Sequence, residues 1–153
     1  MNARLSPDVL CKAGKLPVVP QSAALCYRLV KDGPEILLIT TRRSNRWIIP
    51  KGWLIDGLSP SETAGQEAWE EAGVIGTCST EGLGRFSYVK RHPDRGSVLC
   101  LVDVFPLHVH RLETTYPECG ERRLKWFLPK KAALRVTDHD LAEMLRRFDP
   151  HPH

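Results

Sequence analysis

The chain has 153 residues, of which 42% are hydrophobic, and this length suits one domain with a substantial core rather than two. Its 22 basic and 18 acidic side chains leave a net charge of +4, a mild bias that is compatible with a phosphorylated ligand but selects no partner. The five cysteines include no Cys-x-x-Cys pair and are odd in number, which argues against a secreted disulfide framework and favours a reducing compartment.

The two ends of the chain frame a single expected domain. Residues 1–19 lack the basic-then-apolar pattern of a secretory signal, and we expect this proline-containing leader to be loosely ordered. The domain itself is expected to span residues 20–148, with a short tail at 149–153. No apolar run approaches the roughly 18 residues of a membrane span. We therefore expect a cytoplasmic protein without a membrane partner.

The first part of the domain is predicted to be mostly extended. A strand is expected at Ser22–Val30, and the turn Lys31–Pro34 leads to a second strand, Glu35–Thr41. The second strand is apolar on both faces, which is typical of a central position in a sheet. After a basic loop, Trp47–Pro50 is predicted to be a short extended piece that ends at its proline, and Lys51–Gly57 is predicted to be a loop.

The strongest local signal in the chain marks the start of a helix. Ser59 is a typical N-cap residue, Pro60 suits the first helical position, and Glu62 completes a capping box. The helix is predicted to run to Ala72 and to end at Gly73, which can adopt the left-handed conformation. One face of this helix consists of small residues that would let it lie close against a sheet: Ala64, Gly65, Ala68 and Ala72.

The second half of the domain is predicted to add more strands and a final helix. Leu83–Lys90 and Ser97–Phe105 are expected to form an antiparallel hairpin with a long loop. Shorter strands are predicted at Leu107–Arg111 and Lys125–Leu128. The segment Asp138–Phe148 has apolar residues at helical spacing and is predicted to be an amphipathic helix. This order of elements predicts an α+β fold, with a mixed β-sheet sandwiched between α-helices.

Three glutamates of the predicted central helix share one face. At about 100° per residue, Glu67, Glu70 and Glu71 fall within a sector of roughly 100°. Such a cluster is often only the solvated side of a surface helix. Between Ser59 and Gly73, however, no Lys or Arg offsets their mutual repulsion of about 0.2–0.5 kcal/mol per pair, and the acids also oppose the helix dipole. A divalent cation would reverse both penalties, so the pattern predicts a Mg²⁺ or Mn²⁺ site.

The segment from Gly52 to Val74, GWLIDGLSPSETAGQEAWEEAGV, closely resembles the Nudix box of the Nudix hydrolase family. That box reads Gly, five residues, Glu, seven residues, Arg-Glu, an apolar residue, any residue, Glu-Glu, any residue, Gly and an apolar residue. Seven residues are in register with it: Gly52, Glu67, Ala68, Glu70, Glu71, Gly73 and Val74. Leu58 replaces the first box glutamate and Gln66 replaces the box arginine. In the family these two positions usually brace the loop and helix, so the resemblance implies that catalysis can survive their loss.

The resemblance extends over about residues 20–148 and implies the Nudix fold together with its chemistry. It implies that the Gly52 carbonyl and the carboxylates of Glu67, Glu70 and Glu71 hold Mg²⁺ or Mn²⁺, and that these three glutamates are the catalytic residues. The bound ion would neutralise charge on the phosphate and lower the pKa of a bound water. Glu70 or Glu71 would take the proton from that water. Glu118 is a further candidate for the base or for a metal ligand, although an exposed loop residue is an equally good interpretation of it.

Phosphate groups on either side of the cleaved bond require cationic contacts. Arg43 and Lys51 flank the strand that leads into the box and are the first candidates for substrate binding. Arg42 and Arg46, in the same loop as Arg43, are further candidates. Any single arginine in a loop is more often simply solvated. More distant candidates follow the box: Lys90, Arg91 and Arg95.

The resemblance implies a hydrolase that cleaves a phosphoanhydride bond in a nucleoside diphosphate linked to another moiety. The flanking sequence is most similar to the branch that acts on diphosphoinositol polyphosphates or dinucleoside polyphosphates. One alternative is a nucleoside triphosphate pyrophosphohydrolase that cleans the nucleotide pool. Another is a non-catalytic Nudix-fold sensor of a ligand or RNA, because Leu58 and Gln66 depart from the box. The expected partner is a phosphorylated small molecule rather than a nucleic acid. The sequence does not decide whether the protein forms a homodimer.

Overall fold

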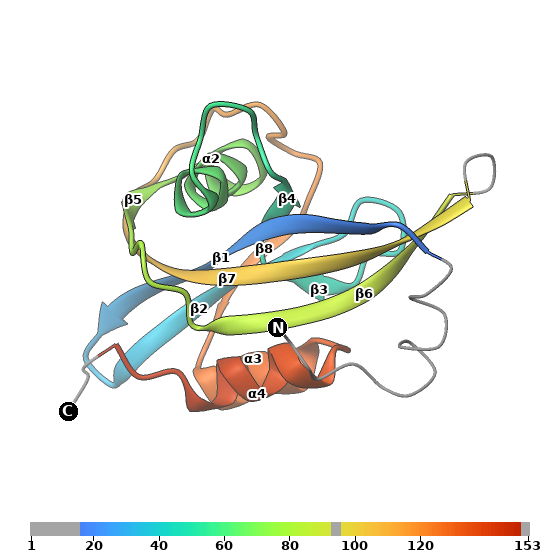
Figure 1. Ribbon diagram of the computed structural model, residues 1–153. Coiled ribbons are helices and arrows are strands. Elements are labelled where there is room, and N and C mark those ends of the chain that lie inside the picture. Colours follow the sequence, from blue (N-terminus) through green and yellow to red (C-terminus); the bar gives the residue numbers. More distant parts are fainter. Residues whose placement is uncertain (1–15, 93–95, 151–153) are drawn as a thin grey trace.

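The computed structural model describes residues 16–92 and 96–150 of the chain. One mixed sheet lies between two helical layers (Figure 1). Helix α2 (Pro60–Ala72) covers one face of the sheet, and helices α3 (Pro129–Arg135) and α4 (His139–Arg147) cover the other. The predicted α+β class, with a sheet sandwiched between helices, is confirmed. Most of the predicted leader and the last three residues of the predicted tail lie outside the described residues.

The sheet is organised around two long central strands. The main path has the order β3-β2-β1-β7-β5, while β4 pairs with β1, β6 with β7 and β8 with β2. Strands β1 and β7 are parallel, and the other pairs are antiparallel. The strands are β1 (Val18–Val30), β2 (Gly33–Thr40), β3 (Trp47–Ile48), β4 (Lys51–Trp53), β5 (Val74–Cys78), β6 (Gly84–His92), β7 (Gly96–Leu112) and β8 (Leu124–Phe127).

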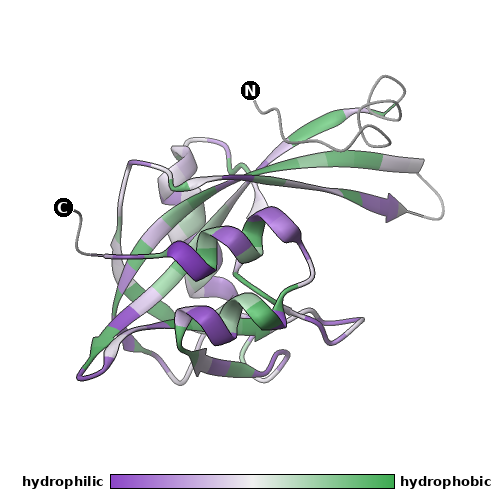
Figure 2. Ribbon diagram, turned by 90° about the horizontal axis from the view of Figure 1, so that it is seen from below, coloured by the Kyte–Doolittle hydropathy of each residue, from purple (hydrophilic) through white to green (hydrophobic). Residues whose placement is uncertain are grey.

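Each face of the sheet has its own hydrophobic core. On one side, Ala64, Ala68 and Ala72 of α2 are fully buried against apolar residues of β1, β2 and β7. On the other side, Leu141 and Leu145 of α4 are buried in a larger cluster with residues of α3 and five strands. Figure 2 shows this second side, where the two helices lie across strands that are largely hydrophobic. Within residues 16–92 and 96–150, no helix is long and apolar enough to cross a membrane.

Most of the predicted elements are present, with shifted ends. Strands β1, β2 and β8, the β6–β7 hairpin and helices α2 and α4 agree with the prediction within a few residues. Strand β1 begins at Val18, inside the predicted leader, because its first residues pair in parallel with β7 from Leu99 onward. The predicted loop after Pro50 begins with β4, whose three residues pair with β1. The chain therefore reaches the box helix from a strand that is held to the sheet.

Three further features differ from the sequence-based expectation. The patterns do not predict β5 or α3, and the N-cap of α3, Leu128, makes no side-chain cap hydrogen bond that could signal it. Strand β7 is one continuous strand, where two were predicted on either side of Pro106. The carbonyl of Pro106 accepts a hydrogen bond from Ser79 N at 2.9 Å. Its nitrogen, which lacks a proton, thus faces the β5–β6 connection rather than β1, and the pairing with β1 continues through the proline.

Candidate active site

Helix α2 is fixed at both ends by the residues that predict it. Ser59 Oγ accepts a hydrogen bond from Glu62 N at 3.2 Å, and Glu62 Oε1 accepts one from Ser59 N at 2.8 Å. Gly73 closes the helix in the left-handed conformation, with φ of 70°. Because the helix is capped and packs on its alanine face, the carboxylates that it carries start from a rigid backbone.

Glu67 and Glu71 form a carboxyl pair on this helix, in which Glu71 is buried and Glu67 is half-buried. Glu71 is only 6% exposed, and its Oε1 accepts a hydrogen bond from the backbone N of Lys51 at 3.3 Å. Burial, together with the hydrogen bond that it donates to Glu67, raises the pKa of Glu71 to about 9. Burial also raises the pKa of Glu67, which accepts that hydrogen bond. The two acids therefore share a proton at neutral pH.

The backbone of Gly52 lies directly against the Glu67 carboxylate. A Cβ added at Gly52 would lie 2.9 Å from Oε2 of Glu67 and closer still to its Cδ and Oε1. No larger residue fits here unless the carboxylate moves. Gly52 belongs to β4, and its partner across the β1–β4 pairing is Ser22. The buried Ser22 hydroxyl has no hydrogen-bond partner among the described residues, so a polar group next to Gly52 makes no hydrogen bond within this part of the protein.

Glu70 points its carboxylate toward the residue that replaces the box arginine. Its Oε2 accepts a hydrogen bond from Gln66 Nε2 at 2.8 Å. The other departure from the box, Leu58, is 37% exposed in the loop before the helix. Gln66 thus retains a contact with a box glutamate, but with a neutral amide in place of a positive charge.

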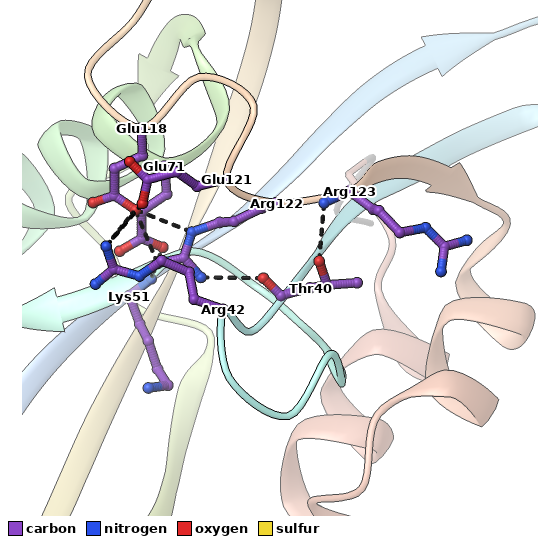
Figure 3. A network of polar contacts seen from close by, with 8 residues as sticks. All are labelled: Thr40, Arg42, Lys51, Glu71, Glu118, Glu121, Arg122 and Arg123. Carbon is purple, nitrogen blue, oxygen red and sulfur yellow. Dashed lines mark hydrogen bonds and ion pairs between the residues drawn. The ribbon is translucent and has the colours of Figure 1, made fainter.

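A loop from the later part of the chain brings more charges to this helix (Figure 3). Glu118 N donates a hydrogen bond to the carbonyl of Glu70 at 2.9 Å. The Glu118 carboxylate accepts hydrogen bonds from Arg122 Nε at 3.1 Å and Nη2 at 3.0 Å, and it lies 4.0 Å from Arg42 Nη1. Arg42 also donates to Glu121 at 2.9 Å. The structure therefore places Glu118 beside the box helix, in a network of two acids and two arginines.

Arg122 and Thr40 belong to this network although no sequence pattern points to them. Arg122 lies in a short charged run that resembles an exposed loop, yet its side chain is only 11% exposed. Thr40, at the end of β2, explains the burial: its carbonyl accepts from Arg122 Nη1 at 3.1 Å and its Oγ1 accepts from Arg123 N at 2.9 Å. These contacts depend on the pairing of β2 with β8, which is distant in sequence and has no local signal.

Lys51 contributes to the site through its backbone rather than its ammonium group. Its side chain extends away from Glu71 (Figure 3). The Nζ donates a hydrogen bond to the Tyr88 hydroxyl at 2.8 Å, and that hydroxyl donates to Gln21 Oε1 at 2.8 Å. Burial lowers the pKa of Lys51. The ammonium group of Lys51 therefore links β4 to β6 by a hydrogen bond and does not face the acidic site.

The three arginines that were predicted to bind phosphate differ in position. Arg42 contacts the acidic network, and its side chain is 56% exposed. Arg43 is exposed. Arg46 is exposed as well, and its Nε donates to Ser44 Oγ at 3.1 Å. Of the more distant candidates, Lys90 lies over the Trp53 ring and Arg91 is exposed, while Arg95 lies outside the described residues.

The donor atoms at this site fit the divalent ion that the box pattern implies. Within the described ranges, no three His, Cys, Asp or Glu side chains already converge as a metal cluster. Glu67 and Glu71 nevertheless meet beside the Gly52 backbone, and Glu70 could join them by leaving Gln66. Burial of Glu71 and its hydrogen bond to Glu67 keep a proton on this pair, and a cation with oxygen ligands would replace that proton.

Comparison with known proteins gives one family and several relatives. A family model described as NUDIX domain matches residues 19–148. Nudix hydrolase 13, mitochondrial, of Arabidopsis thaliana is 29% identical over 128 residues, which cover 72% of this chain and 63% of that protein. Diphosphoinositol polyphosphate phosphohydrolase 2 of Rattus norvegicus is 32% identical over 75 residues, covering 49% of this chain and 39% of that protein. The chain thus spans between about two fifths and two thirds of these two relatives.

Solved structures share the same architecture. An Ap4A hydrolase binary complex from C. elegans superposes with a TM-score of 0.62 at 18% identity, covering 84% of this chain and 93% of that one. A MutT protein from Methanosarcina mazei Go1 superposes with a TM-score of 0.63 at 20% identity, covering 88% and 95%. At these identities the likeness establishes the fold alone.

Proposed function

The chain belongs to the NUDIX domain family, and we propose that it is a metal-dependent hydrolase that cleaves a phosphoanhydride bond in an organic diphosphate. The observation that carries this proposal is the pairing of buried Glu71 with half-buried Glu67 beside the Gly52 backbone. Burying a carboxyl group costs free energy, as the raised pKa of Glu71 reflects, and an ordinary surface helix gains nothing from it. A site that binds Mg²⁺ or Mn²⁺ needs such a carboxyl group as a ligand.

Each residue of the site has a proposed part in the reaction. Gly52, Glu67 and Glu71 would hold the ion, with Glu70 as a further ligand. When bound, the ion would neutralise charge on the phosphate oxygens and make a water molecule more acidic. Glu70, Glu71 and Glu118 are the candidates for the base that would accept a proton from the attacking water. Glu118 suits the role because hydrogen bonds to Arg122 and to the box helix fix its place.

Cations at the mouth of the site are proposed to bind the phosphates that stay with the product. Arg42 is the foremost of these, because it is exposed and already faces the acidic network. Arg43 and Arg46 lie in the same loop and can approach a bound substrate from solvent. Lys51 can take part only if its ammonium leaves Tyr88. Guanidinium groups suit this task because they bind phosphate oxygens in pairs.

The proposed substrates are dinucleoside polyphosphates or diphosphoinositol polyphosphates. The names of the relatives support this choice, since they include diphosphoinositol polyphosphate phosphohydrolases and an Ap4A hydrolase. A nucleoside triphosphate pyrophosphohydrolase is the alternative that membership of the NUDIX domain family also allows. A cytoplasmic location is part of the same proposal, because the four cysteines in the described ranges are free thiols.

A hydrolysis screen tests the proposal. The full chain is incubated with Ap4A, a diphosphoinositol polyphosphate and nucleoside triphosphates, with Mg²⁺ or Mn²⁺ and with EDTA. We expect metal-dependent turnover of one of the first two substrates, and its loss in Glu71→Gln. Glu81→Gln, a change in an exposed loop, is the matched control and should keep full activity. Binding of these compounds without turnover of any of them would instead identify a non-catalytic ligand sensor, as the altered Leu58 and Gln66 positions allow.

A further inference from the structure

The acidic site lacks a cation on its own helix. Between Ser59 and Gly73 the chain has no Lys or Arg, and Gln66 offers Glu70 only a neutral amide. The neighbouring loop adds Glu118, whose backbone N donates to the Glu70 carbonyl, so four acidic residues lie in or beside the last turns of α2. Their charge must be offset from another part of the fold.

Arg122 provides such a cation from the segment that leads into β8. Its guanidinium is committed to the protein: Nε and Nη2 donate to Glu118 Oε1 at 3.1 and 3.0 Å, and Nη1 donates to the Thr40 carbonyl at 3.1 Å. A backbone hydrogen bond joins the same two segments, since Thr40 N donates to the Arg123 carbonyl at 3.1 Å. Three of the five N–H groups of Arg122 are thereby used, and the side chain is 11% exposed.

Glu118 is attached to the box helix as well as to Arg122. Its backbone N donates to the Glu70 carbonyl, and nearby in the same loop Tyr116 packs against Trp69 of α2 with ring centroids 6.4 Å apart. Figure 3 shows the side chain of Glu71 next to those of Glu118 and Arg122. The Glu118–Arg122 pair therefore lies at the same site as the carboxyl pair of Glu67 and Glu71.

We propose that Arg122 is a positioning residue, which holds the Glu118 carboxylate beside Glu67 and Glu71 so that Glu118 completes the acidic site of the hydrolase. This inference rests on the proposed function and gives two arginines different roles, with Arg122 positioning Glu118 and Arg42 binding phosphate. The Arg122 side chain is 11% exposed and bound to protein acceptors. The Arg42 side chain is 56% exposed; its Nη1 pairs with Glu121, and the exposed guanidinium faces solvent, from which a phosphate would approach. The fork of a guanidinium matters here, because a lysine ammonium cannot bridge Glu118 and the Thr40 carbonyl in the same way.

A double-mutant cycle tests this role. The variants are Glu118→Gln, Arg122→Gln and the two combined, with Arg85→Gln as a control that removes an exposed arginine–carboxylate pair, Arg85–Asp103, away from the site. For each variant we measure denaturant unfolding without metal, the dissociation constant for Mn²⁺, and kcat and KM on Ap4A. Arg122→Lys is added because it keeps the charge, and it carries the comparison if Arg122→Gln fails to fold.

The two single variants should weaken Mn²⁺ binding and kcat by similar factors of about 10 to 100, with KM for Ap4A unchanged within about twofold. The combined variant should be no worse than Glu118→Gln, because Arg122 acts through Glu118. Without metal, the cycle should show a coupling of about 3- to 100-fold in the unfolding equilibrium constant. Arg122→Lys should recover only part of the loss, and Arg85→Gln should keep wild-type kcat.

Two results would overturn the proposal. If the losses in kcat and Mn²⁺ affinity multiply in the combined variant, Arg122 acts independently of Glu118. If Arg122→Gln raises KM while kcat holds, Arg122 is a phosphate ligand instead. Failure of the proposed function looks different: the wild-type chain would turn over no substrate, while the unfolding cycle and the Mn²⁺ titration would still report whether the pair is coupled.

Discussion

Replacing Gly52 by alanine is the most discriminating small change that the structure suggests. The added methyl would overlap Cδ and Oε1 of Glu67 and lie 2.9 Å from Oε2. A carbon–oxygen contact needs roughly 3.3 Å, so the Glu67 carboxylate has to retreat by about 1 Å. A misplacement of this size in a site that depends on geometry can lower the rate about 100-fold, which corresponds to ~2.7 kcal/mol.

The same substitution should affect stability little. The atoms in the way are the end of a flexible side chain, and Gly52 has no positive φ that an alanine would strain. Alanine also reduces the freedom of the unfolded chain, which is worth about 0.4–1 kcal/mol in favour of folding. We therefore expect Gly52→Ala to keep its Tm within about 3 °C of wild type and to lose most of its Mn²⁺ affinity and hydrolytic activity.

The assay combines a thermal melt followed by circular dichroism, a Mn²⁺ titration and Ap4A hydrolysis. Gly82→Ala is the matched control: it is another glycine without positive φ, and its added methyl would meet Val104 O at an ordinary 3.4 Å. That variant should keep both stability and activity. Full activity in Gly52→Ala would mean that the close approach of Gly52 and Glu67 is not part of the site.

Three further predictions follow from individual contacts. Ser59→Ala removes the N-cap of α2 and should lower the free energy of unfolding by about 1 kcal/mol, seen as a Tm about 2–4 °C lower, with unchanged Tm as the contrary result. Mn²⁺ binding at pH 7.5 should release about one proton, because the pKa of Glu71 is raised to about 9 and the metal displaces the proton of that carboxyl group. The affinity for Mn²⁺ should therefore rise with pH up to about 9. Calorimetric heats of binding that do not depend on the buffer would contradict the proton release. Tyr88→Phe leaves Lys51 Nζ and Gln21 Oε1 without their shared partner and should cost about 1–3 kcal/mol in denaturant unfolding, whereas a loss below about 0.5 kcal/mol would show that water replaces the hydroxyl.

Local signals explain why the box helix could be predicted almost residue by residue. Its capping box, its proline and its terminal Gly73 act within a few positions of each end, and all three are present as expected. The buried face could be predicted as well, because Ala64, Ala68 and Ala72 recur at helical spacing. The close approach of Gly52 to Glu67 was expected only through the family resemblance, since β4 had been predicted as a loop.

Long-range contacts explain what the sequence did not predict. Pro106 normally argues against a continuous strand, and only the position of Ser79 shows that its missing N–H faces away from β1. Arg122 looks like one of several solvated charges until Thr40 and Glu118 are brought to it from other elements. In both places the role of a side chain or backbone group depends on a partner that is far away in the chain.

Anomalous diffraction from crystals soaked in MnCl₂ would locate a metal ion at the box helix. We expect a manganese peak bonded to the carboxylates of Glu67 and Glu71 beside the Gly52 backbone, and no such peak in crystals of Glu71→Gln soaked in the same way. Wild-type crystals without manganese at that position, at a concentration that supports turnover, would contradict this expectation.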